Sequence, residues 1–198
     1  MTFTDRNQAG NLLAEKLSSY RGQHALVLGL ARGGVVTARA VADGLNLPLD
    51  VVVVKKIGAP GQEELAIGAL APDGVSYGDF GKSQITNLND QIKQKTLLYR
   101  KGRKPYRLHN KTAILVDDGA ATGATMEAAI RWVRKKHAKK IVVALPVVPK
   151  ELIPKISPEV DELVVLHAPD EFGAVGQFYE RFEQVTDEEV VELLDNKS

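Results

Sequence analysis

The chain has 198 residues, of which 44% are hydrophobic, and a formal net charge of +1. This length and composition suffice for one globular domain with a substantial core, and they exclude a chain that is disordered as a whole. The sequence contains no cysteine, which excludes disulfides, thiolate zinc sites and cysteine nucleophiles. No apolar run approaches the roughly 20 residues that span a bilayer, and no basic and apolar leader opens the chain, so we expect a cytoplasmic protein without membrane contact.

The small net charge hides an uneven distribution. Between Asp90 and Asp117 there are eight Lys or Arg residues and no acid, whereas residues 151–198 hold 13 acids and three bases. Such a basic tract fits a solvated face or loop, a lid that attracts an anionic substrate, or a nucleic-acid contact. Only Tyr99 and Tyr106 interleave with the charges, which argues against a platform for single-stranded nucleic acid.

The first half of the chain alternates helical and strand patterns. Apolar residues recur at helical spacing near the start, and apolar or β-branched runs of strand length follow. The predicted elements are a helix at about 5–19, a strand at 25–30, a helix at 35–45, a strand at 50–56, a short strand at 64–70 and a charged helix at about 84–101.

The second half continues the alternation. It is predicted to contain a loop at 101–111, a strand at 112–116, an amphipathic helix, and strands at 141–145 and 163–166. Thr186 and Glu189 have the spacing of a capping box and should open a final helix. Strands that alternate with helices imply an α/β fold with a mostly parallel sheet covered on both faces, and ligands at the carboxyl ends of its strands.

Residues 114–125 read ILVDDGAATGAT, a strand followed by two carboxylates and a turn of small residues. The first N–H groups of a helix lack intrahelical partners and lie at the positive end of the helix dipole, so such a turn can bind a phosphate. Asp117 and Asp118 would repel a phosphate at close range, so the ligand should offer them hydroxyl donors or a cation. A ribose 5-phosphate meets both requirements. The stretch lacks the Gly-Lys-[Ser/Thr] ending of a Walker loop and the glycine spacing of a dinucleotide fingerprint.

The same stretch resembles the motif that binds 5-phosphoribosyl 1-diphosphate (PRPP) in type I phosphoribosyltransferases, without a gap from Ile114 to Thr125. The resemblance implies that Asp117 and Asp118 hold the ribose hydroxyls and contribute to a Mg²⁺ site, directly or through PRPP or water. It implies that the following loop binds the 5-phosphate through Gly119, Ala120, Ala121, Thr122, Gly123, Ala124 and Thr125. The alternative is an ordinary strand–turn–helix junction with two solvated aspartates.

A second resemblance to the family follows the first predicted strand, where the chain reads Ala31-Arg32-Gly33-Gly34. Two adjacent glycines permit unusual backbone angles and the close approach of a ligand. Taken alone, the segment could equally be a helix start with a surface arginine. Type I members carry a short loop here, often ending in Gly-Gly, whose backbone binds pyrophosphate. The resemblance therefore implies that Ala31, Arg32, Gly33 and Gly34 bind the pyrophosphate of PRPP and that Arg32 assists catalysis.

Lys55 and Lys56 end the strand predicted at 50–56. In members of the family a lysine at this place contacts the pyrophosphate, and a flexible lid lies in the segment that follows. The resemblance thus makes Lys55 and Lys56 catalytic candidates and residues 57–111 a lid insertion, whose basic tract suits a tetra-anionic substrate. The alternative is that both lysines only extend from a strand end into solvent.

Type I members often carry a divergent hood over the acceptor after the last core strand, and residues 167–185 occupy that place. Phe172, Phe178 and Tyr179 could sandwich a flat ring, although two of the three are better interpreted as core residues. His167 is a candidate general base because histidine titrates near physiological pH, but a lone histidine at a strand end is more often structural.

The resemblance implies a three-layer α/β/α phosphoribosyltransferase fold in one domain, residues 1–198. The core would comprise 20–56 and 112–166, with the lid insertion between them, the small hood after them, and a C-terminal helix at 186–198. A homodimer is also implied.

The implied reaction is the Mg²⁺-dependent transfer of the 5-phosphoribosyl group of PRPP to a nitrogen nucleophile, as in nucleotide salvage, with release of pyrophosphate. In 6-oxopurine phosphoribosyltransferases an aspartate commonly precedes the Thr-Gly pair, but here Ala121 stands there, and alanine cannot accept a proton. This departure argues against a hypoxanthine- or guanine-type enzyme and leaves other nucleobases or an amine open. The alternative function is a non-catalytic regulator that senses PRPP or a nucleotide on the same fold.

Overall fold

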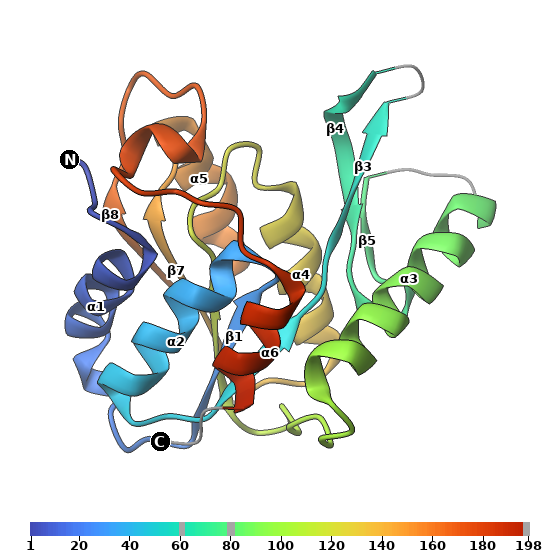
Figure 1. Cartoon of the computed structure of the whole chain (residues 1–198), viewed down its shortest axis with the longest axis horizontal. Helices are drawn as coiled ribbons and strands as arrows, with labels where there is room; N and C mark the ends of the chain where they lie inside the picture. The colour runs from blue at the N-terminus through green and yellow to red at the C-terminus, as the bar shows by residue number, and fades with distance from the viewer. Residues whose placement is uncertain (60–61, 79–81, 196–198) are drawn as a thin grey trace.

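A five-stranded parallel sheet, in the order β2-β1-β6-β7-β8, forms the centre of the computed structural model (Figure 1). The structure describes residues 1–59, 62–78 and 82–195. The strands of this sheet are β1 (Ala25–Leu30), β2 (Leu49–Val52), β6 (Thr112–Val116), β7 (Lys140–Val147) and β8 (Glu162–His167). Each lies within or close to a stretch predicted as strand, because a run of apolar residues of strand length is what a parallel sheet buries on both faces.

Helices cover both faces of the parallel sheet, which confirms the predicted three-layer fold. Alternate strand residues point to opposite faces, so Ile114 packs on one side and Leu115 on the other. One face is covered by α1 (Arg6–Lys16), α2 (Gly33–Leu45), α6 (Asp187–Asp195) and part of α3 (Lys82–Arg100). The other is covered by α4 (Ala124–Lys135) and the short α5 (Ile153–Ile156). Short 3₁₀ turns occur at Ser18–Tyr20, Pro72–Gly74, Lys150–Leu152, Ser157–Glu159 and Val175–Phe178.

The strand predicted at 50–56 is split between two sheets, so that prediction was wrong. β2 pairs with β1, whereas β3 (Lys55–Ala59) pairs antiparallel with β4 (Gln62–Leu70), and β4 pairs with β5 (Ser76–Tyr77). Lys55 and Lys56 therefore begin β3 instead of ending β2. The β-branched residues run through the break without interruption, so periodicity could not mark it. Figure 1 shows this second sheet and α3 on the same side of the molecule.

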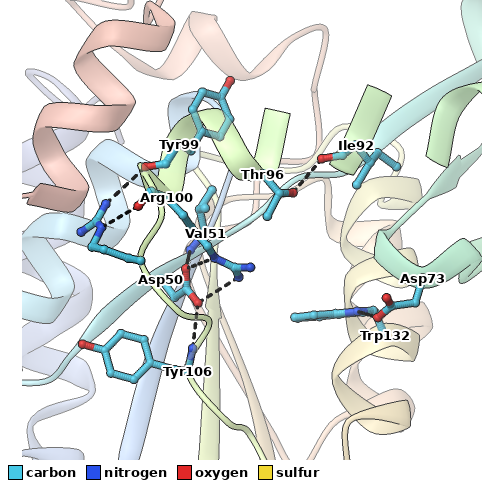
Figure 2. Close-up of polar contacts among 10 residues, drawn as sticks. Asp50, Val51, Asp73, Ile92, Thr96, Tyr99, Arg100, Tyr106 and Trp132 are labelled. Atoms are coloured by element: carbon cyan, nitrogen blue, oxygen red, sulfur yellow. Dashed lines mark hydrogen bonds and ion pairs between the residues drawn. The ribbon is translucent and has the colours of Figure 1, made fainter. Parts of the chain in front are cut away.

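The second half of the basic tract lies away from the carboxyl ends of the parallel strands. Its loop, residues 101–111, leads into the amino end of β6, so the interpretation of this loop as part of a lid does not hold. Arg100 donates to both carboxylate oxygens of Asp50, each at 3.0 Å, and the Tyr106 N–H donates to the same carboxylate at 3.3 Å (Figure 2). The lid assignment for the rest of the insertion stays a prediction.

The acidic C-terminal helix neutralises another part of the tract. Lys101 and Arg103 form ion pairs with Asp195 at 3.2 and 3.4 Å, and Lys95 pairs with Asp187. The predicted capping box opens this helix, because the Glu189 N–H donates to Thr186 Oγ1 at 3.2 Å and the Thr186 N–H donates to Glu189 Oε2 at 2.7 Å. Among the described residues, no helix has both the length and the apolar character needed to cross a bilayer.

Candidate functional site

Three of the predicted site segments meet at one edge of the parallel sheet. Residues 31–34 follow β1, residues 55–56 lie just beyond the end of β2, and residues 117–125 follow β6. In the sheet β1 lies between β2 and β6, and all three strands run in the same direction. The carboxyl ends of these strands are therefore neighbours, which is where open parallel sheets bind ligands.

The glycine pair touches the acidic pair directly. A β-carbon added to Gly33 would lie 2.1 Å from Asp118 Oδ2, and one added to Gly34 would lie 2.5 Å from Asp117 Oδ1 and 2.8 Å from Asp117 Cα. Neither position has room for a side chain unless its neighbours move. The predicted pyrophosphate loop and the predicted ribose-binding carboxylates thus form one continuous surface.

Arg32 joins β1 to α2 and presents an exposed side chain. The Ala31–Arg32 peptide bond is cis. The Arg32 guanidinium lies near the first turn of α6, where it adds to the effect of hydrogen bonds from Lys95 and Tyr99 that hold the pKa of Asp187 below its ordinary value. Arg32 is therefore a solvent-accessible cation between the glycine pair and α6.

The two carboxylates differ in their surroundings. Burial, followed by the adjacent negative charge of Asp118, raises the pKa of the Asp117 carboxyl well above its ordinary value, and the positive charge of Lys56 partly opposes this rise. The Asp118 N–H donates to Asp117 Oδ1 at 2.9 Å. A buried carboxylate beside a second one favours ligands that bring hydroxyl donors or a cation. The Lys56 ammonium therefore acts electrostatically on the Asp117 carboxyl.

The loop from Gly119 to Thr125 leads into the N-terminus of α4. Gly123 is the N-cap, with a positive φ of 79° that glycine adopts without strain, and no side chain caps the helix there. Ala121 and Thr122 are exposed, and within the described chain no acceptor is found for their backbone N–H groups or for that of Thr125. These amides are available to an anion at the positive end of the α4 dipole.

Two of the predicted phosphate-binding residues are already engaged. Ala120 is buried, and its N–H donates to the Val147 carbonyl at 3.1 Å, so it anchors the loop to β7 and has no free amide. The Ala124 N–H faces Thr122 Oγ1 at a long 3.5 Å. The available N–H donors are therefore concentrated in the exposed middle of the loop and in the first turn of α4.

Arg6, to which no sequence pattern pointed, reaches the site from α1. Its Nε donates to Asp118 Oδ2 at 2.8 Å, and both side chains are largely buried. Its Nη1 donates to the Glu183 carbonyl at 2.9 Å, and its guanidinium lies 3.8 Å from the centre of the Phe182 ring. No local pattern around Arg6 signals this role, because its partners are more than 100 positions away in the chain.

The candidate hood residues pack mainly on one another. Phe172 stacks on Phe178 with ring centres 5.3 Å apart, and His167 meets Phe178 edge to face at 5.6 Å. Tyr179 is buried against Phe3, so one of the three aromatics is a fully buried core residue, where two were expected. Phe172 and Phe178 are only partly buried at the margin of the same cluster.

One contact ties this cluster to the site. The Tyr179 hydroxyl donates to the backbone carbonyl of Asp118 at 2.6 Å, so the C-terminal segment supports the acidic pair from behind. Burial lowers the pKa of His167, which favours the neutral ring.

A hollow of about 390 Å³ adjoins the glycine pair. It is lined by Arg6, Arg32, Gly33, Phe182 and the segment 183–185. Two arginines and one partly exposed aromatic ring thus face the same space beside the predicted pyrophosphate loop. Phe182 borders this hollow, whereas the hood aromatics proposed from the sequence do not line it.

The donor set can be tested for its fit to Mg²⁺. The described residues contain no group of three or more His, Cys, Asp or Glu side chains suited to a metal ion, so a site built from protein ligands alone is not present there. Mg²⁺ commonly takes one or two carboxylates together with substrate phosphates and waters. Asp117 and Asp118 provide such carboxylates, and a cation would offset the burial and the repulsion that together raise the pKa of Asp117.

Comparisons with known proteins agree with this architecture. A family model for the phosphoribosyl transferase domain matches residues 5–178. Two curated Mycobacterium tuberculosis proteins, from strains CDC 1551 and H37Rv, are provisionally named phosphoribosyl transferases, and each is 42% identical to 98% of this chain. The chain spans about half the length of these relatives, 46% of each.

Solved structures give the same result. The crystal structure of TT1426 from Thermus thermophilus is 39% identical, covers 98% of both chains and superposes with a TM-score of 0.84. A hypoxanthine-guanine phosphoribosyltransferase from Bacillus anthracis shares the fold, with a TM-score of 0.53, 13% identity and coverage of 87% of this chain and 85% of its own. The chain belongs to the phosphoribosyl transferase domain family, and its fold is that of the type I phosphoribosyltransferases.

Proposed function

We propose that this protein transfers the 5-phosphoribosyl group of PRPP to a nitrogen nucleophile, a nucleobase or another amine, and releases pyrophosphate. The observation that carries the proposal is the direct contact between Gly33-Gly34 and Asp117-Asp118. A ligand that meets both pairs must combine an anionic group with hydroxyl groups a short distance away. The pyrophosphate and ribose of PRPP have this arrangement.

Each half of the site supplies what one part of PRPP requires. The carboxylates accept hydrogen bonds from the ribose hydroxyls, and the free amides between Ala121 and Thr125 donate to the 5-phosphate. At the other end, the amides of the glycine pair and the charge of Arg32 hold the pyrophosphate. Lys56 adds positive charge near the acidic pair, and Lys55 precedes it at the start of β3.

The reaction forms a bond from the nucleophilic nitrogen to C1 of the ribose and breaks the bond from C1 to the pyrophosphate oxygen. The nitrogen loses a proton, and the electron pair of the broken bond leaves with pyrophosphate. The protein contributes by aligning the reactants and stabilising the departing negative charge. Mg²⁺ held by PRPP and the acidic pair would shield the charge of the diphosphate.

The hollow beside Gly33 is the candidate acceptor site. Phe182 stacks on Tyr179 and lies against the Arg6 guanidinium, so its exposed ring edge borders the hollow, and the backbone of residues 183–185 offers hydrogen-bonding groups to a planar acceptor. Ala121 provides no carboxylate, so the acceptor does not depend on the aspartate that commonly serves 6-oxopurines. The proposed acceptor substrate is therefore a base or amine that needs no proton acceptor at that position.

The test is release of pyrophosphate from PRPP and Mg²⁺ over a panel of nucleobases and small amines. We expect at least one acceptor to support turnover, and Asp118→Asn to abolish it. Binding of PRPP without turnover of any acceptor would instead favour a PRPP-sensing regulator on this fold. If neither PRPP nor ribose 5-phosphate binds, both functions are wrong.

A further inference from the structure

A second cleft, of about 740 Å³, lies between α3, α4 and the loop at 104–109. We call it the α3–α4 cleft. None of the residues proposed to bind PRPP lines it. Figure 2 shows Trp132 extending from α4 toward the space beside Thr96 and the Asp50–Arg100 pair. Its volume lies within the range of small-molecule pockets, roughly 300–1,000 Å³.

The walls of the α3–α4 cleft present apolar and aromatic side chains to solvent. Leu97 is 71% exposed and Tyr106 is 49% exposed, and both line the cleft. Trp132 is held in place by a 3.0 Å hydrogen bond from its Nε1 to Asp73 Oδ2. The indole itself is only 8% exposed, so the exposed Leu97 and Tyr106 supply most of the apolar surface that a flat ring could bury, with the edge of Trp132 beside them.

The rim of the α3–α4 cleft is basic. Among the described lining residues, five carry a positive charge and Asp73 is the one acid. Three of the five already face carboxylates, since Arg100 pairs with Asp50, Lys136 with Asp73 and Lys93 with Asp90.

The other two cations of the rim have no such partner. In the part of the chain that the structure describes, Lys104 and Arg107 have no carboxylate within ion-pair distance, and both are exposed. These two cations are therefore available to an anion carried by a ligand.

We propose that the α3–α4 cleft binds a nucleoside monophosphate, with its base against Leu97 and Tyr106 at the edge of Trp132 and its phosphate on Lys104 and Arg107. The ligand needs both a flat ring and a negative charge, because the walls of the cleft offer apolar surface and Lys104 and Arg107 on its rim have no carboxylate partner among the described residues. A strand of nucleic acid fits less well. It needs a charged track with successive stacking platforms, whereas the cleft offers two cations without a carboxylate partner among the described residues, beside a single open cleft.

The chain contains a single tryptophan, so its fluorescence reports on this cleft alone. We would titrate AMP, GMP and UMP into the protein saturated with PRPP, which keeps the nucleotide out of the candidate active site. A saturable change in Trp132 fluorescence is expected. Adenosine lacks the phosphate and inorganic phosphate lacks the base, so each should bind at least about tenfold more weakly than AMP.

The decisive variant is Lys104→Ala/Arg107→Ala, in which both changes are at exposed positions. It should weaken nucleotide binding about tenfold or more, as measured by fluorescence and calorimetry. The matched control, Lys139→Ala/Lys155→Ala, removes the same charge at exposed positions outside the cleft and should leave binding unchanged. Asp118→Asn should also leave it unchanged, which separates this proposal from the proposed transferase activity.

Five results would overturn the proposal. The first is no fluorescence change or heat with any mononucleotide at millimolar concentration. The second is an equal loss of nucleotide binding in the control variant, and the third is loss of nucleotide binding in Asp118→Asn, which would place the nucleotide in the active site. The fourth is tighter binding of single-stranded RNA than of any mononucleotide. The fifth is self-association of the protein that removes nucleotide binding.

Discussion

The candidate site and the α3–α6 interface differ in how completely their charged and polar groups are paired. At the α3–α6 interface, which we define by Lys95, Lys101 and Arg103 on or after α3 and Asp187 and Asp195 on α6, every one of these charges faces an opposite charge. At the site, two carboxylates adjoin each other, and the amides beside them have no acceptor in the described chain.

This difference separates a structural charge from a functional one. The runs of like charge in the sequence suggested an anion-attracting lid, yet much of the basic tract only balances the acidic end of the chain. By contrast, burial and the adjacent charge of Asp118 raise the pKa of Asp117, and Lys56 only partly opposes them. A carboxyl with a perturbed pKa at a strand end is a better indicator of a ligand site than charge density along the chain.

The largest effect on stability is expected from Arg100→Ala. This change leaves Asp50 buried without its ion-pair partner, and breaking a buried pair costs about 3–5 kcal/mol. Urea denaturation should show the loss. Lys93→Ala, which removes an exposed partner of Asp90, should cost less than about 1 kcal/mol. Similar losses in the two variants would mean that the Asp50–Arg100 pair is not structural.

Asp117→Asn should lower PRPP turnover about 100-fold or more, because a charge-assisted hydrogen bond to the ribose is lost. It should also raise the Tm at pH 7. The pKa of Asp117 is raised in the folded state, so its contribution to stability is full below the unfolded pKa and is lost as pH rises through the folded pKa.

Asparagine imitates the protonated carboxyl, so the gain in Tm over the wild type should shrink as the pH is lowered toward 4. One kcal/mol corresponds to about 2–4 °C for a protein of this size. A Tm below that of the wild type at pH 7 would contradict the raised pKa.

Substitutions at the two glycines should affect turnover and stability to different degrees. Gly34→Ala brings a methyl group against the backbone of Asp117, and such overpacking costs about 1–3 kcal/mol. Gly33→Ala meets the side-chain ends of Asp118 and Arg6, which can move, so it should lower turnover with a smaller change in Tm. Thermal unfolding and pyrophosphate release on both variants check this, and the reverse ranking of Tm would contradict the contacts.

Arg6→Ala should raise the KM for PRPP by roughly tenfold, since Asp118 loses the ion pair that orients it. Arg6→Lys keeps the charge but not the forked geometry that also reaches the Glu183 carbonyl, so it should recover only part of the affinity. Unchanged KM in both variants would limit Arg6 to a structural role.

The smallest effect is expected for Asp187→Asn, at about 1 kcal/mol or less because the pair with Lys95 is partly exposed. Hydrogen bonds from Lys95 and Tyr99 lower the pKa of Asp187, so its contribution is present above the unfolded pKa and lost as pH falls through the folded pKa. At pH 7 the Asp187→Asn variant should be less stable than the wild type, whereas Asp117→Asn should be more stable. The loss of stability in Asp187→Asn should vanish in acid. A difference that grows as the pH falls would contradict this.

Local patterns predicted most of the elements because each depends on nearby residues. Apolar runs located β1 and β6, the capping box located the start of α6, and small residues after Asp118 located the turn into α4. Periodicity failed where one β-branched run crosses from β2 to β3, since both sheets accept the same residues.

By itself the sequence determined the alternation of strands and helices and the three segments at their ends, since these follow from side-chain periodicity and turn chemistry. Only the tertiary structure decided that Gly33-Gly34 touches the acidic pair, that Arg6 is paired with Asp118, and that several cations of the basic tract pair with carboxylates of α6. Strand order and helix packing set these contacts, and both depend on the burial of surface between segments that are distant in the chain.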